Sequence, residues 1–121
     1  MQWLQQGLAG HVIKYNETGA PVHFTGEGMA LVSPLIFKQY ARETGPEAEA
    51  DIAGLQIQRE VIKAGWHRMQ ASKGNGKLNI LRYDVIGRGG LPVGKLSVIV
   101  LVDPDRWVMP VPPSNPVLRL A

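Results

Sequence analysis

The chain has 121 residues, of which 45% are hydrophobic, and its formal net charge is +3. This length suits one hydrophobic core rather than two ordinary domains, and the absence of cysteine excludes disulfides and thiolate metal sites. No run approaches the ~20 apolar residues of a membrane span, and the N-terminus lacks the pattern of a signal peptide, so we expect a cytoplasmic chain without membrane contact.

The first third of the chain predicts a helix and then strands. Apolar residues at helical spacing in "QWLQQGLA" indicate a short docking helix that ends at Gly10. Residues 11–33 are typical of two or three short strands, broken at 16–21 and 26–28 where glycines permit turns. Three side chains are expected to point inward: Val22, Phe24 and Leu31.

Two helices are predicted next. Ser33-Pro34 indicates a helix start, because serine can accept from the free amides of the first turn and proline has no amide to lose there. This helix should run from Pro34 to about Glu43. Pro46 begins a second helix, which should extend to about Ala64 with Gly65 as its C-terminal cap.

The second helix divides into an apolar side and a polar strip. Ala53, Ile57, Val61 and Ala64 fall on one side of a helical wheel. A separate strip, spaced i, i+3, i+7, consists of Gln56, Arg59 and Lys63. Glutamine and arginine can bond base edges and lysine suits phosphate, so the strip fits a recognition surface. A solvated helix face without a ligand is the alternative.

After Gly65 the pattern changes to strands. "WHRMQ", "KLNILRYDVI" and "KLSVIVLVD" predict a two- or three-stranded antiparallel sheet, with glycine-rich links at 74–76 and 87–94. The five prolines that follow indicate a tail unable to continue this sheet. We therefore expect a single domain over residues 1–109 and a proline-rich extended strap over 110–121, anchored by Trp107 and Val108.

The basic residues are concentrated in one segment. Between Gln56 and Leu101 eight basic residues stand against two acidic ones, a balance of +6, while the rest of the chain has a balance of −3. Such a segment suits a polyanion if its side chains share one face. A solvated hairpin whose charges maintain solubility is an equal alternative.

Signals for an enzyme are weak. Gly89 to Lys95 has the G-x-x-x-x-G-K spacing of a P-loop, but Leu96 replaces the required Ser or Thr and the following segment forms a strand rather than a helix. The histidines at 11, 23 and 67 are scattered and no carboxylates accompany them. No cofactor, metal site or catalytic residue is therefore expected, and an enzyme is the weakest hypothesis.

The order of elements predicts an α+β, winged-helix-like fold with three helices and a small antiparallel sheet. In such folds the later helix enters the major groove and the hairpin turn reaches the DNA backbone. Lys73 and Lys77 flank the turn at 74–76 and would contact phosphate, and three further residues could extend these contacts: Arg68, Arg82 and Arg88. Winged helices also serve as protein-interaction modules, so the fold does not identify the ligand.

Several segments resemble a known family. They are "WLQQGL" near the start, Asn16, "VH" at 22–23, "LVSPLIFKQYA" at 31–41, "LQ" at 55–56, "LNILRYDVIG" and "KLSVIVLVDP". Together they resemble the C-terminal domain of TraI-type relaxases, the conjugal DNA nickase/helicase proteins of bacterial integrating conjugative elements. The resemblance implies an accessory domain, since the nicking chemistry belongs to an upstream region with His and Asp metal ligands.

We accordingly predict a non-catalytic DNA-binding domain that positions a relaxase on transfer-origin DNA. Its expected contacts are Gln56, Arg59, Lys63, Arg68, Lys73, Lys77, Arg82 and Arg88. The alternative is a protein-protein interaction module that docks the relaxase to a coupling protein or to a second copy of itself, using Trp107 and the proline-rich tail.

Overall fold

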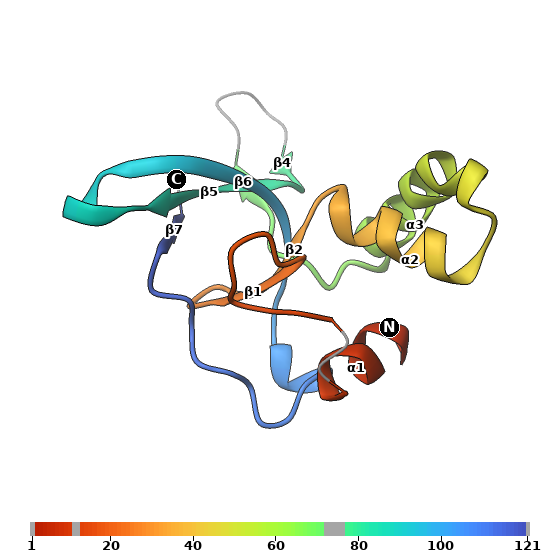
Figure 1. The fold of residues 1–121 in the computed structure, drawn as a ribbon, viewed down its shortest axis with the longest axis horizontal. Coiled ribbons are helices and arrows are strands. Elements are labelled where there is room, and N and C mark those ends of the chain that lie inside the picture. The colour runs from red at the N-terminus through yellow and green to blue at the C-terminus, as the bar shows by residue number, and fades with distance from the viewer. Residues whose placement is uncertain (1, 11–12, 72–76, 121) are drawn as a thin grey trace.

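The computed structural model describes residues 2–10, 13–71 and 77–120, and these form an α+β fold (Figure 1). The helices are α1 (Gln2–Ala9), α2 (Leu35–Thr44) and α3 (Ala50–Ala64). The strands are β1 (Val22–Thr25), β2 (Gly28–Val32), β3 (Gln70–Ala71), β4 (Lys77–Leu78), β5 (Leu81–Ile86), β6 (Pro92–Leu101) and β7 (Leu118–Leu120). Short 3-10 turns lie at Glu47–Glu49, Arg88–Gly90 and Pro104–Arg106.

Five strands form one antiparallel sheet in the order β1-β2-β6-β5-β7. The prediction of a two- or three-stranded sheet was therefore wrong. Strand β6 is ten residues long, and its C-terminal half pairs with β2 while its N-terminal half pairs with β5, as in Ala30↔Val100 and Asp84↔Lys95. One long strand thus joins the two hairpins, a long-range pairing that local patterns do not encode.

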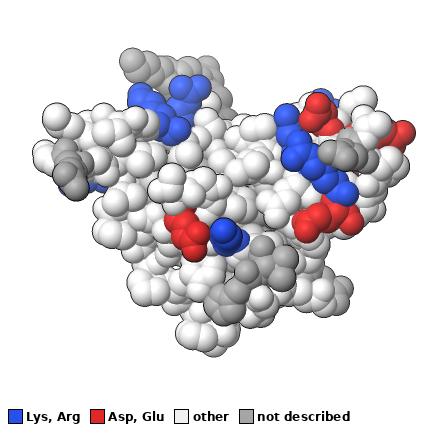
Figure 2. Space-filling model, viewed as in Figure 1, with Lys and Arg blue, Asp and Glu red and all other residues white. Residues whose placement is uncertain are grey.

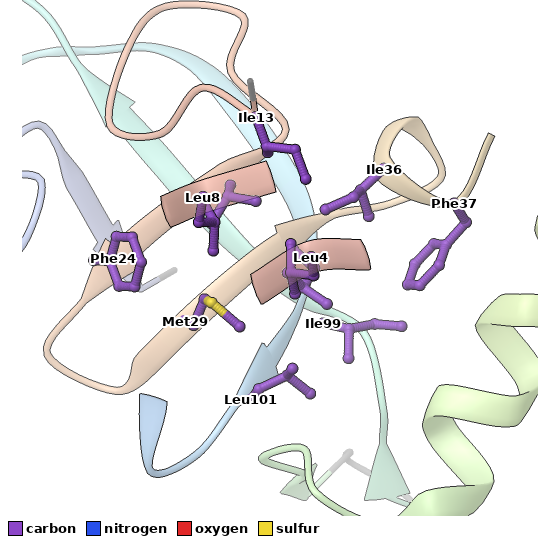
Figure 3. Close-up of a cluster of buried hydrophobic side chains, with 11 residues drawn as sticks. Leu4, Leu8, Ile13, Phe24, Met29, Ile36, Phe37, Ile99 and Leu101 are labelled. Atoms are coloured by element: carbon purple, nitrogen blue, oxygen red, sulfur yellow. The ribbon is translucent and has the colours of Figure 1, made fainter. Parts of the chain in front are cut away.

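The two faces of the sheet carry separate cores. On one face Phe24, Met29, Leu31 and Ile99 pack with Leu4 and Leu8 of α1 and with Ile36 and Phe37 of α2 (Figure 3). On the other face Ala30, Leu81, Tyr83, Val98 and Val100 form a smaller cluster. The predicted inward positions Val22, Phe24 and Leu31 are all buried.

The sheet is curved around the smaller cluster (Figure 1). Strands β1 and β5 are not neighbours in the sheet, yet the Thr25 hydroxyl lies 3.1 Å from the Tyr83 hydroxyl. The Tyr83 hydroxyl donates a 2.6 Å hydrogen bond to Glu27 at the β1–β2 turn. Burial, followed by the hydrogen bond to Glu27, raises the pKa of Tyr83 to about 12. These bonds satisfy a buried phenol and hold the curvature.

Helices α2 and α3 pack closely against each other at one end of the molecule (Figure 1). Gly54 is buried at their crossing, where a Cβ atom would lie 3.2 Å from the backbone of Phe37 and Lys38. Helix α3 ends as predicted at Gly65, which adopts φ 79° and whose amide bonds the carbonyl of Ile62. A 3-10 turn occupies the expected first turn at Glu47–Glu49.

The predicted capping role of Ser33 is wrong. Helix α2 begins at Leu35, Pro34 occupies the cap position, and no side chain bonds the free amides there. The Ser33 hydroxyl instead donates a 2.6 Å hydrogen bond to the Gln58 side chain of α3. A hydrogen bond from the residues before α2 to α3 thus takes the place of the predicted cap within α2.

The strands after α3 differ from the predicted runs. Of "WHRMQ" only the last residue, Gln70, lies in a named strand, and "KLNILRYDVI" is divided into β4 and β5 by a bend at 79–80. Strands β3 and β4 pair antiparallel, as expected for strands flanking the 74–76 turn, but that turn lies outside the described residues. The longer hairpin is β5–β6, whose turn contains Gly89 and Gly90 at positive φ.

The tail continues the sheet, contrary to the prediction. Strand β7 pairs with β5 through Tyr83↔Leu120 and Val85↔Leu118. Upstream of it, the Asn115 amide donates to the carbonyl of Phe24 at 2.7 Å, and the Asn16 side chain donates to the carbonyl of Pro113 at 2.8 Å. The prolines end at Pro116, so the last residues are free to donate ladder hydrogen bonds. Trp107 and Val108 pack against the main core, as predicted.

Candidate nucleic-acid interface

The predicted polar strip lies on the solvent face of α3. Gln56, Arg59 and Lys63 are all exposed, while Gly54 and the partly buried Ile57 and Val61 lie on the opposite side against α2 and the core. The 15-residue helix is long enough to present the strip over two full turns. The structure therefore brings these three predicted residues together on one accessible helix face.

Two apolar side chains extend the same face. Ile52 and Leu55 are 68% and 50% exposed, and their positions on the helical wheel lie within ~60° of Arg59. The sequence does not reveal their exposure, since an exposed branched residue cannot be told from a core residue by type alone. The solvent face of α3 thus combines apolar contacts at its start with cations toward its end.

Arg68 and Arg82, the two arginines of the sheet region predicted to bind DNA together, do not share one face. The Arg68 amide bonds the carbonyl of Val100, and His67 pairs with Leu101, so Arg68 lies opposite Val100. Arg82 lies opposite Ser97. Side chains alternate along a strand, and positions 97 and 100 are therefore on opposite faces. Arg68 and Arg82 are exposed but leave the sheet in opposite directions.

The remaining predicted contacts are only partly described. Lys73 lies outside the described residues, and for Lys77 and Arg88 only the backbone positions are described, in β4 and in the turn after β5. The structure therefore places the side chains of five of the predicted contacts, three on α3 together with Arg68 and Arg82, but does not test a convergence at the 74–76 turn.

A row of charges across the sheet was missed. Register places Lys95 and Arg119 on either side of Asp84, on the same face as Arg82. Among the residues that the structure describes, one carboxylate oxygen of Asp84 is buried without a hydrogen-bond partner. The signal was hidden because Arg119 belongs to the tail, whose pairing with β5 was not predicted.

The charges on the visible face form separate groups (Figure 2). Lysine and arginine side chains lie over the helical end, where acidic side chains flank them, and a second group lies over the sheet, with uncharged surface between. The ion pair found among the described residues joins Lys38 and Asp51 at 3.3 Å. Arg59 and Lys63 have no such partner within the described parts of the chain, so their charges face solvent.

An apolar pocket of ≈ 340 Å³ lies beside the polar strip. Its walls come from α1, β2, α2, α3 and the Trp66 side chain shortly after α3, and they include Trp3, Tyr40, Ile57 and Ala64. Trp3 and Tyr40 form an edge-to-face pair with ring centroids 5.1 Å apart. Glu60 is the charged residue in the lining, and it is exposed, so it stands at the mouth. The pocket is not evident from the sequence because its walls come from four separate segments of the chain.

An aromatic and cationic cluster adjoins the pocket. The rings of Trp66 and Trp107 lie 5.7 Å apart between centroids. The Arg106 guanidinium lies 5.6 Å from the Trp66 ring and 5.3 Å from the Trp107 ring. Such cation–π contacts hold a cation in place at an exposed site. Arg106 is thus positioned next to one wall of the pocket.

The buried histidines have structural partners. His23 Nε2 donates to the carbonyl of Ala20 at 3.1 Å, and its Nδ1 accepts from the Asn115 side chain at 3.1 Å. Burial lowers the pKa of His23, which favours this neutral form. His67 Nε2 bonds Asn79 at 2.8 Å. Across the described residues, no three His, Asp or Glu side chains are grouped to hold a metal ion.

The P-loop-like segment has no phosphate-binding geometry. Gly89 and Gly90 form the β5–β6 turn, and Lys95 lies within β6. A strand therefore follows the glycines where a P-loop requires a helix N-terminus. Within residues 2–10, 13–71 and 77–120, no helix has the length and apolar character needed to span a membrane.

Comparison with known protein families identifies the family of the chain. The family described as "Putative conjugal transfer nickase/helicase TraI C-term" matches residues 1–120. The chain belongs to this family. The TraI C-terminal assignment covers every element of the fold and confirms the resemblance seen in the sequence.

A solved structure shares the fold of this TraI C-terminal domain. It is the crystal structure of the C-terminal domain of the Salmonella enterica protein STY4665, with a TM-score of 0.74 and 20% sequence identity. The match covers 99% of this chain and 91% of that one. No curated protein sequence matches the chain. At this identity the likeness to the Salmonella domain concerns the fold alone.

Proposed function

We propose that this TraI C-terminal domain is a non-catalytic DNA-binding domain of a conjugal relaxase and helps to position it on transfer-origin DNA. The observation that carries the proposal is the solvent face of α3, where Gln56, Arg59 and Lys63 lie together without ion-pair partners among the described residues. The family name supports a role in conjugal transfer.

The helix pair supports a groove-binding geometry. Helix α2 packs closely on α3 through the Gly54 crossing and the Ser33–Gln58 hydrogen bond, so α3 is held rigidly while its outer face stays free. In a winged-helix-like arrangement the outer face of the later helix reads the major groove. Gln56 and Arg59 would reach base edges and Lys63 a phosphate, and Ile52 and Leu55 would offer apolar contacts to thymine methyl groups.

The chemistry of the exposed groups supports the proposed non-catalytic role. The cations on α3 and Arg82 can bind phosphate but supply no nucleophile, and the described histidines are engaged in structural hydrogen bonds. Ser33 donates its hydroxyl to Gln58 rather than to a base. The domain would therefore supply affinity and orientation for a nicking site elsewhere in a relaxase.

A salt titration of DNA binding tests the proposal. Each neutralised phosphate contributes about −0.9 to the slope of log K against log salt on duplex DNA, so the Arg59→Ala/Lys63→Ala double variant, which removes the proposed phosphate contact of Lys63, should make the slope less steep by roughly 0.9. A Lys14→Ala/Arg42→Ala variant removes two exposed charges outside the basic segment and should leave the slope unchanged. Lys73→Ala/Lys77→Ala tests the predicted wing in the same assay. Failure of the wild-type chain to bind transfer-origin DNA at low salt, as duplex or single strand, would refute the proposal.

The second candidate is a protein-docking module for a coupling protein or a second copy of the chain. Exposed apolar residues on the C-terminal segment favour it: Met109 is 79% exposed and lies close to Val111 in the sequence. Deleting residues 110–121 would not test this idea, because the deletion removes β7 and exposes β5. A Met109→Ser/Val111→Ser variant leaves the pairing intact. Loss of a partner from a pull-down with unchanged DNA affinity would favour docking.

A further inference from the structure

We propose that the apolar pocket beside α3 receives a single unstacked nucleobase, which gives the domain a binding mode for single-stranded DNA besides the duplex contacts of α3. This inference rests on the proposed DNA-binding function and specifies the ligand of the same helix. The proposed ligand of the pocket is the base of a nucleotide and not a peptide side chain.

The shape and lining of the pocket suit a flat heterocycle. A volume of ≈ 340 Å³ is at the lower end for ligand sites and leaves room for one small ring system. Trp3, Tyr40 and Trp66 line it, and aromatic side chains are the surfaces on which unpaired bases stack. A base inside a duplex cannot reach such walls, since it must first leave its stack.

The charges around the pocket match a nucleotide. Glu60 lies at the mouth and can accept a hydrogen bond from the exocyclic amino group of a base. On the helical wheel Gln56 and Lys63 flank Glu60 on its solvent side, while Ile57 and Ala64 flank it on the pocket side. Arg106 is held next to Trp66. The site therefore offers a carboxylate to the base and cations to the phosphates outside.

This pattern disfavours a peptide ligand. A basic peptide would meet Lys63 and Arg106 around the mouth, and an acidic peptide would meet Glu60. A nucleotide carries a hydrogen-bond donor on its apolar part and its negative charge on the connected phosphate. It is the ligand class that satisfies the carboxylate and the cations together.

Fluorescently labelled oligonucleotides of about 12 nucleotides test the inference with the 121-residue chain. We expect oligo-dC to bind roughly tenfold more tightly than an abasic oligomer with the same phosphates, and to quench tryptophan fluorescence from the pocket. Ala64→Phe should fill the pocket and weaken oligo-dC binding by about tenfold, without affecting the abasic oligomer. Ala48→Phe, at an exposed alanine outside the pocket lining, is the matched control.

Glu60→Ala provides a second variant at an exposed position that carries no packing role. The wild type should prefer oligo-dC to oligo-dT by several-fold, since thymine lacks an exocyclic amino group, and Glu60→Ala should abolish this preference. Equal binding of oligo-dC and abasic DNA, or of wild type and Ala64→Phe, would overturn the inference. Duplex binding that depends on Arg59 and Lys63 would then leave the proposed function standing, whereas no binding to any DNA would remove both.

Discussion

Replacing Gly54 by alanine tests how closely α2 and α3 approach. An added Cβ would lie 3.2 Å from the Lys38 nitrogen, 3.2 Å from the Phe37 carbonyl carbon and 3.3 Å from its oxygen. These atoms belong to the backbone of α2, so the helix must move by a few tenths of an ångström. Overpacking of this kind costs about 1–3 kcal/mol, and alanine in a helix interior recovers about 1 kcal/mol relative to glycine.

We therefore expect Gly54→Ala to lower the free energy of unfolding by about 1 kcal/mol, and Gly54→Val by about 3 kcal/mol because its branched Cβ cannot turn away from α2. Urea unfolding followed by circular dichroism measures both. Gln56→Ala and Gln56→Gly, on the exposed face of the same helix, calibrate the propensity difference without packing. The reasoning fails if Gly54→Ala raises the free energy of unfolding by as much as the difference between Gln56→Ala and Gln56→Gly. That result would mean that the two helices do not touch at Gly54.

Three further perturbations follow from buried polar contacts. Asn115→Ala removes the bonds from its side chain to His23 and from the Val117 amide, and should cost about 1–3 kcal/mol in urea unfolding; no change would mean that the tail is not fixed there. The lowered pKa of His23 means that the unfolded chain binds the extra proton more readily, so stability should fall as pH drops below about 6.5, by at most about 1.4 kcal/mol per pH unit from this residue. Urea unfolding of the wild type and of His23→Gln at pH 7.5 and pH 5 measures the contribution of His23. The same loss of unfolding free energy in both proteins between these pH values would contradict the prediction. The pKa of about 12 for Tyr83 predicts a late component in an absorbance titration that Tyr83→Phe lacks, with stability lost between about pH 10 and 12 as the unfolded chain ionises first.

Local signals predicted the helices well. Periodicity and Gly65 placed α3 and its end, and the inward positions Val22, Phe24 and Leu31 followed from alternation. Apart from strand boundaries after α3, the failures involve partners distant in sequence. Ser33 bonds Gln58 rather than capping its own helix, and β6 pairs with β2 across more than sixty residues. Propensity describes each segment alone and cannot choose among distant partners.

The candidate site was predicted only in part for the same reason. The α3 strip lies on one helix, so its spacing sufficed to place Gln56, Arg59 and Lys63 together. Arg68 and Arg82 were grouped by charge, but sheet register sends them to opposite faces. The pocket is lined by residues from Trp3 to Trp66, and no pattern within one segment indicates that these side chains meet.

The two edges of the five-stranded sheet affect how readily copies of the chain associate. The outer edge of β1 is already occupied, because the Phe24 amide bonds the Asn16 side chain at 2.8 Å and its carbonyl accepts from the Asn115 amide. At the other edge β7 covers β5 and is only three residues long. Free strand edges are templates for intermolecular strand addition, and short or occupied edges oppose it. Copies of this domain should therefore resist edge-to-edge aggregation even at high concentration.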